Sequence, residues 1–180
     1  MPLAHHWTLA DGTPLTLRAL HPGDADALGQ LIDELPTPDR RRRFHGAVNG
    51  VSTAWLSRLT SVDPAREIAL VVTARRHGRE LLVADARCAV DMTGQDAEFA
   101  LMVAGGPWRR RGIGQRALLG LAEAAGERGL QWLYGSVLSD NLPMLALVRR
   151  CGFLGTPHRS DRRLVMVERR VQPAVTAAAA

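Results

Sequence analysis

Apolar and polar residues follow two different periods along the chain. Between residues 24 and 35, apolar side chains recur every three or four positions, which is the spacing of one face of an amphipathic helix. Residues 37–39 (Thr-Pro-Asp) supply a hydroxyl cap, a proline for the first turn and an early acid, so a second helix is predicted to begin there. The run Arg40–Arg43 falls inside that helix, and an irregular helical pattern continues past Trp55. A short strand at 16–19 is predicted before these helices.

The period changes after residue 64. Three apolar, β-branched stretches separated by turn residues predict an antiparallel meander with strands at 68–73, 81–83 and 97–103. The later elements are predicted to be a long helix that begins near Ile113 and ends at Gly129, a strand at 131–137, a helix at 141–150, and closing strands at 153–154 and 163–171. The predicted order, β-α-α-β-β-β-α-β-α-β-β, indicates a single α/β domain with a mixed sheet over residues 15–171. Residues 172–180 are predicted to form a disordered tail.

Composition narrows the class of protein. The chain has 180 residues, 46% of them hydrophobic and 23% charged, which is typical of a globular domain and excludes collagen-like, disulfide-scaffold and globally disordered proteins. Two cysteines without CxxC spacing, no apolar run of about 18 residues and no signal-peptide pattern lead us to expect a cytoplasmic protein without membrane contact. The histidines are scattered, with His5 and His6 in an N-terminal segment predicted to be loose, so no metal site is expected.

All 23 cationic side chains are arginines, and the formal net charge of +5 indicates an anionic partner. Base composition of the genome explains most of that inventory, so the positions of the arginines are more informative than their number. Three of them stand together in the segment Trp108-Arg-Arg-Arg-Gly-Ile-Gly-Gln115, between a predicted strand and the first turn of the long helix. Unpaired amides and the positive end of the helix dipole favour phosphate at such a point, and glycines allow its close approach. We therefore expect residues 109–115 to bind phosphate.

Two other phosphate motifs fit less well. The spacing Gly112-x-Gly114-x-x-Ala117 satisfies the dinucleotide fingerprint, but that motif follows the first strand of a parallel βαβ unit and needs an acid at the tip of the next strand. Here the segment follows an antiparallel meander, and the next strand ends in Ser136-Val137. The Walker-type P-loop requires a lysine, and the chain has none.

Two motifs resemble one known family. Arg109-x-x-Gly112-x-Gly114 is similar to the Q/R-x-x-G-x-G/A acetyl-CoA signature of the GNAT family of N-acetyltransferases. The segment from Asn141 to Phe153 resembles that family's N-x-x-(A/M)-x-x-L-x-x-x-x-G-F motif. The predicted element order matches the GNAT fold, in which the central sheet splays. Short matches at 39–44 and 97–100 are similar to the GNAT domains of bacterial protein-lysine acetyltransferases.

The resemblance implies a site for acetyl-CoA, used as a co-substrate and without a metal. Its pantetheine arm would pair with the end of the third meander strand, its pyrophosphate would meet the amides of residues 110–115, and an asparagine at the start of the last helix would bond the arm. The residues implied are Met102, Val103, Arg109, Arg110, Arg111, Gly112, Ile113, Gly114, Gln115 and Asn141. Arg149 and Arg150 are candidates for the 3′-phosphate, although a solvated helix face explains them equally well.

An amine must be neutral to attack a thioester, so a base or a water relay is needed. Glu98 is the best candidate, on a strand whose other side chains are apolar, with an ordinary surface glutamate as the alternative reading and Asp96 as a weaker candidate. Many GNAT enzymes carry a tyrosine in the last helix that protonates the departing thiolate, whereas this chain has Val148. A thiol with a pKa of about 8.5 leaves tolerably without an acid, and Ser139 or a water is a possible substitute.

These observations favour an enzyme that transfers the acetyl group of acetyl-CoA directly to an amine of a protein lysine or a small molecule. The alternative is a non-catalytic acyl-CoA-binding or regulatory module that has lost turnover. A nucleic-acid binder is disfavoured because aromatic residues make up only 4% of the chain and no recognition motif occurs. The expected partners are acetyl-CoA and the amine-bearing acceptor, with no nucleic acid and no membrane, for a monomer or homodimer. The sequence does not identify the acceptor.

Overall fold

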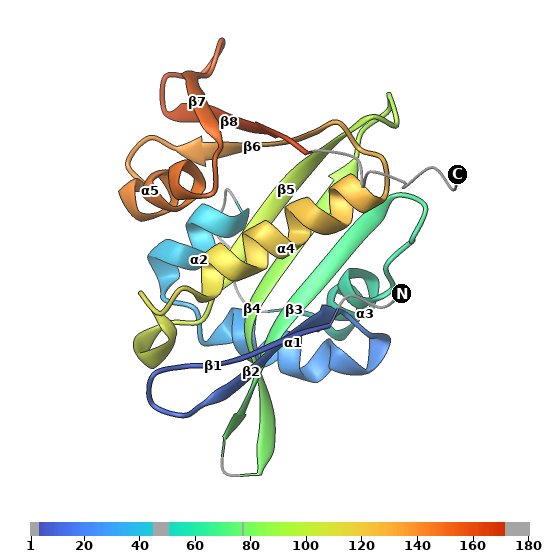
Figure 1. Ribbon diagram of the computed structural model, residues 1–180, viewed down its shortest axis with the longest axis vertical. Helices are drawn as coiled ribbons and strands as arrows, with labels where there is room; N and C mark the ends of the chain where they lie inside the picture. The colour runs from blue at the N-terminus through green and yellow to red at the C-terminus, as the bar shows by residue number, and fades with distance from the viewer. Residues whose placement is uncertain (1–3, 45–50, 77, 172–180) are drawn as a thin grey trace, which may run out of the picture.

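An eight-stranded mixed sheet forms the centre of the protein, in the order β1-β2-β3-β4-β5-β6-β8-β7 (Figure 1). The computed structural model describes residues 4–44, 51–76 and 78–171, so the predicted tail at 172–180 lies outside the described residues. The strands are β1 (His5–Thr8), β2 (Pro14–Ala19), β3 (Glu67–Arg76), β4 (Arg79–Val90), β5 (Asp96–Val103), β6 (Trp132–Leu138), β7 (Leu154–Pro157) and β8 (Leu164–Arg170). The helices are η1 (Pro22–Asp24), α1 (Ala25–Asp33), α2 (Thr37–Phe44), α3 (Thr53–Thr60), η2 (Gly106–Trp108), α4 (Ile113–Glu127) and α5 (Leu142–Arg150).

The centre of the sheet opens between β5 and β6. These two strands are the parallel neighbours of the sheet, and they pair at three positions only, from Asp96 opposite Trp132 to Glu98 opposite Tyr134. Both strands continue beyond that point, β5 bonded to β4 and β6 bonded to β8. The predicted splay of a mixed sheet is therefore confirmed, and it begins immediately after Glu98.

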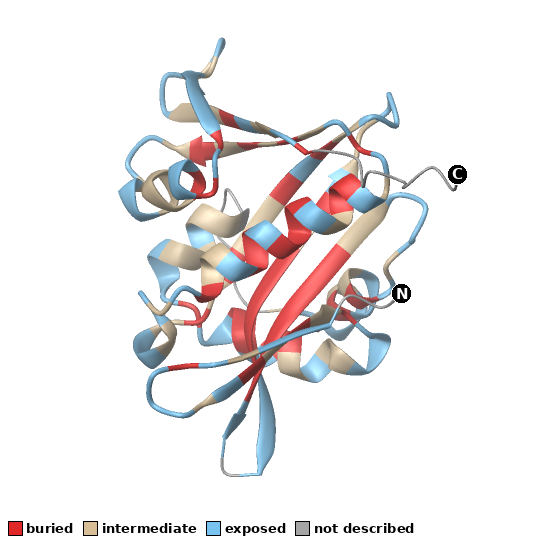
Figure 2. Ribbon diagram, viewed as in Figure 1, coloured by how far each residue is buried: buried red, intermediate tan, exposed pale blue. Residues whose placement is uncertain are grey.

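Helices cover both faces of the sheet. An added methyl at Gly114 of α4 would touch Leu101 of β5, whereas Asp85, the register partner of Met102, pairs with Arg43 of α2. Neighbouring residues of a strand point to opposite faces, so α4 and α2 lie on opposite sides of the sheet. Figure 1 shows α4 crossing β3, β4 and β5. In Figure 2 the buried positions run along the central strands and along the inner side of α4.

The structure corrects the predicted element order at three places. The segment with His5 and His6 is not loose but forms β1, which pairs antiparallel with β2. The irregular helical stretch around Trp55 is a separate helix, α3, with Ser52 as its N-cap. The second meander strand, predicted at 81–83, extends from 79 to 90 as β4 because its charged residues bond within the fold rather than ending the strand.

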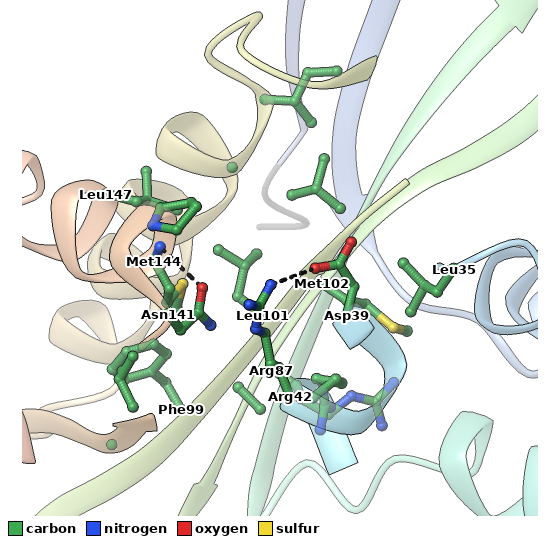
Figure 3. Close-up of a pocket in the computed structure, with 18 of the residues that line it drawn as sticks. Leu35, Asp39, Arg42, Arg87, Phe99, Leu101, Met102, Asn141, Met144 and Leu147 are labelled. Atoms are coloured by element: carbon green, nitrogen blue, oxygen red, sulfur yellow. Dashed lines mark hydrogen bonds and ion pairs between the residues drawn. The ribbon is translucent and has the colours of Figure 1, made fainter. Parts of the chain in front are cut away.

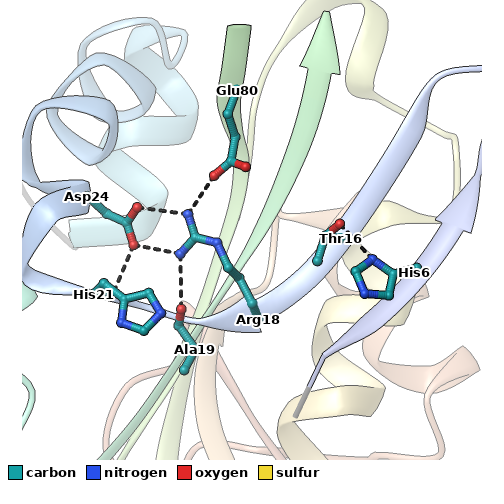
Figure 4. Close-up of polar contacts among 7 residues, drawn as sticks. All are labelled: His6, Thr16, Arg18, Ala19, His21, Asp24 and Glu80. Carbon is teal, nitrogen blue, oxygen red and sulfur yellow. Dashed lines mark hydrogen bonds and ion pairs between the residues drawn. The ribbon is translucent and has the colours of Figure 1, made fainter. Parts of the chain in front are cut away.

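A polar cluster ties the start of α1 to the sheet (Figure 4). Arg18 on β2 donates to both carboxylate oxygens of Asp24 at 2.8 Å and to Glu80 of β4 at 2.7 Å. Asp24 also accepts a bond from the backbone amide of His21 at 2.8 Å. The turn that leads into α1 is thereby held against β2 and β4 by charge-assisted hydrogen bonds.

Candidate functional site

A cavity of about 1640 Å³ opens where β5 and β6 separate. It is larger than the roughly 300–1000 Å³ of a typical small-molecule pocket, which leaves room for two reactants. The candidate base and all ten residues implied for acetyl-CoA line it: Glu98, Met102, Val103, Arg109, Arg110, Arg111, Gly112, Ile113, Gly114, Gln115 and Asn141. Of the two candidates for the 3′-phosphate, Arg150 lines the cavity and Arg149 does not. Figure 3 shows Asn141, Met144 and Leu147 on one side of the cavity, with Leu35 and Asp39 across from them.

The free edge of β5 presents backbone groups to this cavity. The amide of Ala104 donates to the carbonyl of Val83 at 2.9 Å, so it points toward β4. Hydrogen-bonding directions alternate along a strand, so the amides of Leu101 and Val103 point the other way, into the gap. Met102 lies with its backbone toward β4 and its side chain buried. Leu101, which the sequence reasoning missed, therefore presents its backbone groups to the gap together with Val103.

The loop after β5 ends in the first turn of α4. Gly112 is the N-cap of this helix and has a left-handed φ of 78°, and Arg110 also has a positive φ of 58°. The carbonyl of Gly112 receives the amide of Arg116 at 3.0 Å as the first bond of the helix. The amides of residues 113–115 precede that bond and have no partner within the helix. Three consecutive donors therefore lie at the end of the cavity.

The two glycines of the loop serve different purposes. A Cβ atom at Gly112 would meet nothing within 4 Å, so its requirement is the left-handed backbone. A Cβ atom at Gly114 would lie 3.2 Å from the side chains of both Val103 and Leu147. Gly114 thus lets α4, β5 and α5 pack closely at the edge of the cavity.

The three consecutive arginines have three different environments. Arg109 donates from Nε to the carbonyl of Ala104 at 3.0 Å and from Nη2 to Asp39 of α2 at 2.9 Å. Arg111 pairs with Asp11 at 2.8 Å, while Arg110 is exposed. The loop is therefore bonded on one side to the β1–β2 turn and on the other to α2, and Arg110 is the arginine directed to solvent.

Glu98 stands at the point where the sheet opens. Its side chain is exposed and shares a face with Met102, on the α2 side of the sheet. Its register partner on β6 is Tyr134, the one tyrosine of the chain. Burial, and then the charge of Glu98, raise the pKa of Tyr134. Asp96, the weaker candidate for a base, is half-buried on the same face.

Helix α5 closes the opposite side of the cavity. The side-chain oxygen of Asn141 caps this helix by accepting the amide of Met144 at 3.4 Å. Met144 and Leu147 line the cavity, and Val148 is buried with 2% of its surface exposed. The residue at the position of the missing tyrosine therefore packs in the interior.

Sequence reasoning missed the basic wall of the cavity under α2 and α3. Four arginines line it: Arg42, Arg43, Arg58 and Arg87. Behind them Asp85, which has no exposed surface, accepts bonds from Arg87 at 2.6 and 3.1 Å. The signal available in the sequence was an aspartate and an arginine two positions apart within an apolar stretch.

Within residues 4–44, 51–76 and 78–171, no group of three or more His, Cys, Asp or Glu side chains is placed to hold a metal ion. None of the helices over these same ranges is long and apolar enough to cross a membrane.

The family model described as the acetyltransferase (GNAT) domain matches residues 14–154. Among solved structures, the GNAT domain of PAT from S. lividans superposes with a TM-score of 0.81 at 22% identity, covering 93% of this chain and 96% of that one. A spermidine N-acetyltransferase from Vibrio cholerae, solved with CoA and spermine, has a TM-score of 0.68 at 19% identity over 87% of this chain and 95% of its own.

A third similar structure is a cAMP-binding acyltransferase from Mycobacterium smegmatis, with a TM-score of 0.63 and 27% identity. The match covers 99% of the present chain but 50% of the mycobacterial one. The chain thus spans about half the length of that acyltransferase.

Proposed function

The chain belongs to the GNAT acetyltransferase family, and from this premise we propose that it transfers the acetyl group of acetyl-CoA directly to the amine of a protein lysine or a small molecule. The observation that carries the proposal is one continuous cavity. It joins the first turn of α4, the open edge of β5 and an exposed glutamate at the start of the splay.

The donor half of the cavity suits the charged and the polar parts of acetyl-CoA. The three unpaired amides of residues 113–115 and the positive end of the α4 dipole favour a pyrophosphate. The amides and carbonyls of Leu101 and Val103 would pair with the amide groups of a pantetheine arm, as a missing strand would. The amide of Val103 is a donor for the thioester oxygen, whose negative charge grows in the transition state. The nitrogen of Asn141 is available to the same arm.

The acceptor half supplies the proton transfer. In the reaction, the lone pair of a neutral amine attacks the thioester carbon, a C–N bond forms, and the C–S bond breaks as the thiolate leaves. Glu98 would take one proton from the amine, directly or through a water, and the thiolate would later gain a proton from solvent. A carboxylate at the entrance of the gap fits this role because it lies beside the free edge of β5.

Turnover is tested by incubating the protein with acetyl-CoA and a panel of amines and measuring released thiol. Cys88 and Cys151 are buried, and burial raises the pKa of the Cys88 thiol to about 12, so the protein's own thiols add little background. We expect Glu98→Gln to lower kcat by about 100-fold or more while acetyl-CoA affinity stays unchanged. Glu168→Gln is the matched control, because Glu168 is also exposed and pairs with Tyr134 from the other side. Equal turnover of the two variants would exclude Glu98 as the base.

One observation favours a second candidate function. Val148 is buried where many relatives have a tyrosine, so the protein lacks that general acid, as a non-catalytic acyl-CoA-binding module would. Calorimetric binding of acetyl-CoA without thiol release from any amine would support this second candidate and exclude the enzyme.

A further inference from the structure

The acceptor half of the cavity has a basic wall built from three separate elements. Arg42 and Arg43 come from α2, Arg58 from α3 and Arg87 from β4, and all four line the cavity. The side chains of Arg43 and Arg87 are mostly buried, with 14% and 13% of their surface exposed. Buried cations of this kind are retained only where carboxylates or another anion offset their charge.

The carboxylates in contact with this wall are fewer than its arginines. Asp85 forms ion pairs with both Arg87, at 2.6 Å, and Arg43, at 3.8 Å. Asp39 forms an ion pair with Arg42 at 3.3 Å and a second one with Arg109, in the loop after β5, at 2.9 Å. Among the residues that the structure describes, four guanidinium groups therefore share these two carboxylates.

Two further residues of the wall bear on its balance of charge. Burial alone would lower the pKa of Arg87, but the charge and hydrogen bonds of Asp85, together with the charge of Glu67, another lining residue, outweigh it and raise that pKa. Arg58 has no carboxylate within 4 Å among the residues that the structure describes. The wall keeps an excess of positive charge. Burial lowers the pKa of Arg43, although the charge of Asp85 opposes that shift.

The basic wall begins one step along the sheet from Glu98. Glu98 is the register partner of Ala89, and Ala100 is the partner of Arg87. Residues two apart on a strand share a face and lie about 7 Å apart along it. Glu98 and Arg87 therefore rise side by side from the same face, an acid at the mouth of the gap and a cation next to it.

We propose that the acceptor is an amine that carries a carboxylate near its amino group, so that the amine meets Glu98 while the carboxylate meets the basic wall. This inference rests on the proposed function and names its substrate class. Arginine suits the task because its planar fork binds a carboxylate through two parallel hydrogen bonds. A polyamine, which has no anionic group, would bring cations against Arg42, Arg58 and Arg87.

The test compares acceptors that differ only in the carboxylate. L-lysine is set against L-lysine amide, and a peptide with glutamates flanking one lysine is set against the same peptide with glutamines. We expect the carboxylate member of at least one pair to have a KM lower by about tenfold, the worth of a charge-assisted pair of hydrogen bonds. The pair that responds tells whether the carboxylate comes from a free amino acid or from an acidic peptide.

Arg58→Gln should remove most of that preference, raising KM for the carboxylate acceptor more than KM for the amide acceptor. Arg58 is exposed, so this variant is expected to fold. Arg58→Lys should restore part of the preference. Equal or better use of the uncharged member in both pairs, or use of spermidine as good as that of the best carboxylate acceptor, would overturn the inference. If no acceptor releases thiol, the proposed function fails, and calorimetry of L-lysine against L-lysine amide with the CoA-loaded protein still decides whether the wall binds a carboxylate.

Discussion

Replacing Asp85 by asparagine tests whether one buried carboxylate holds the basic wall together. Asp85 has no exposed surface and accepts two bonds from Arg87, at 2.6 and 3.1 Å, with Arg43 3.8 Å away. Asp85→Asn removes the negative charge and leaves both guanidinium groups mostly buried. Removing one partner of a buried ion pair costs about 3–5 kcal/mol. We expect the free energy of unfolding to fall by about 3 kcal/mol, which lowers Tm by about 6–12 °C in a chain of this size.

The chain offers a matched control for this experiment in Asp161. Arg163 binds Asp161 through the same two atoms, Nε at 3.1 Å and Nη2 at 2.8 Å, again across two residues, but Arg163 is 83% exposed. Urea and thermal unfolding followed by circular dichroism should therefore leave Asp161→Asn near the parent midpoint, since exposed ion pairs contribute little. The double variant Asp85→Leu/Arg87→Leu should recover part of the loss, because it removes both charges. Equal midpoints for Asp85→Asn and Asp161→Asn would refute the reasoning.

Two further predictions concern packing and pH. Gly114→Ala places a methyl 3.2 Å from side chains of β5 and α5. We expect the free energy of unfolding to fall by about 1–3 kcal/mol and acetyl-CoA to bind more weakly, as measured by calorimetry. An alanine variant that binds acetyl-CoA as tightly as the parent would contradict this packing role. Burial alone would raise the pKa of Asp24, but the bonds from Arg18 and the His21 amide outweigh it and lower that pKa. Asp24 therefore stabilises the fold above its unfolded pKa of about 3.9, and this contribution is lost as pH falls through the lower folded value. Asp24→Asn should flatten the acid side of the stability–pH profile measured by urea unfolding, and an unchanged profile would exclude this contribution.

The local pattern of apolar residues was sufficient to predict an element that has one apolar face, and it failed to predict the extent of an element whose charged residues are paired inside the fold. The long helix was predicted to stop at Gly129, and that glycine has a φ of 84° just after α4. The strand at 81–83 was cut short because Asp85 and Arg87 interrupt its apolar pattern. The hydrogen bonds between Asp85 and Arg87 and the packing of α2 over them form only in the folded protein, so hydrophobic periodicity does not predict them. The strand β1 was missed for a related reason, since its His-His-Trp-Thr segment has no alternating pattern and depends on pairing with β2.

The candidate site also has a part that the local sequence predicts and a part that it does not. The loop at 109–115 is local, because glycines, arginines and a helix start occur within seven residues, and the structure places all of them at one cavity. The partner of Arg109 was not predictable, since Asp39 lies 70 residues away. The acceptor wall is assembled from α2, α3 and β4, and the short family match at 39–44 in α2 does not indicate which residues of α3 and β4 lie beside it. Its charge emerges only when the sheet brings these elements together.

The absence of lysine has a chemical consequence for a cavity of this kind. A cation placed beside an activated acetyl group must not itself be a nucleophile. A lysine buried like Arg43 or Arg87 would have its pKa lowered and would become a neutral amine, which is the form that attacks thioesters. An arginine stays protonated, so the wall can hold an anionic group next to the proposed thioester site without being acetylated. The same property makes Arg87→Lys more than a change of shape, because it would introduce a competing acceptor into the acceptor half of the cavity.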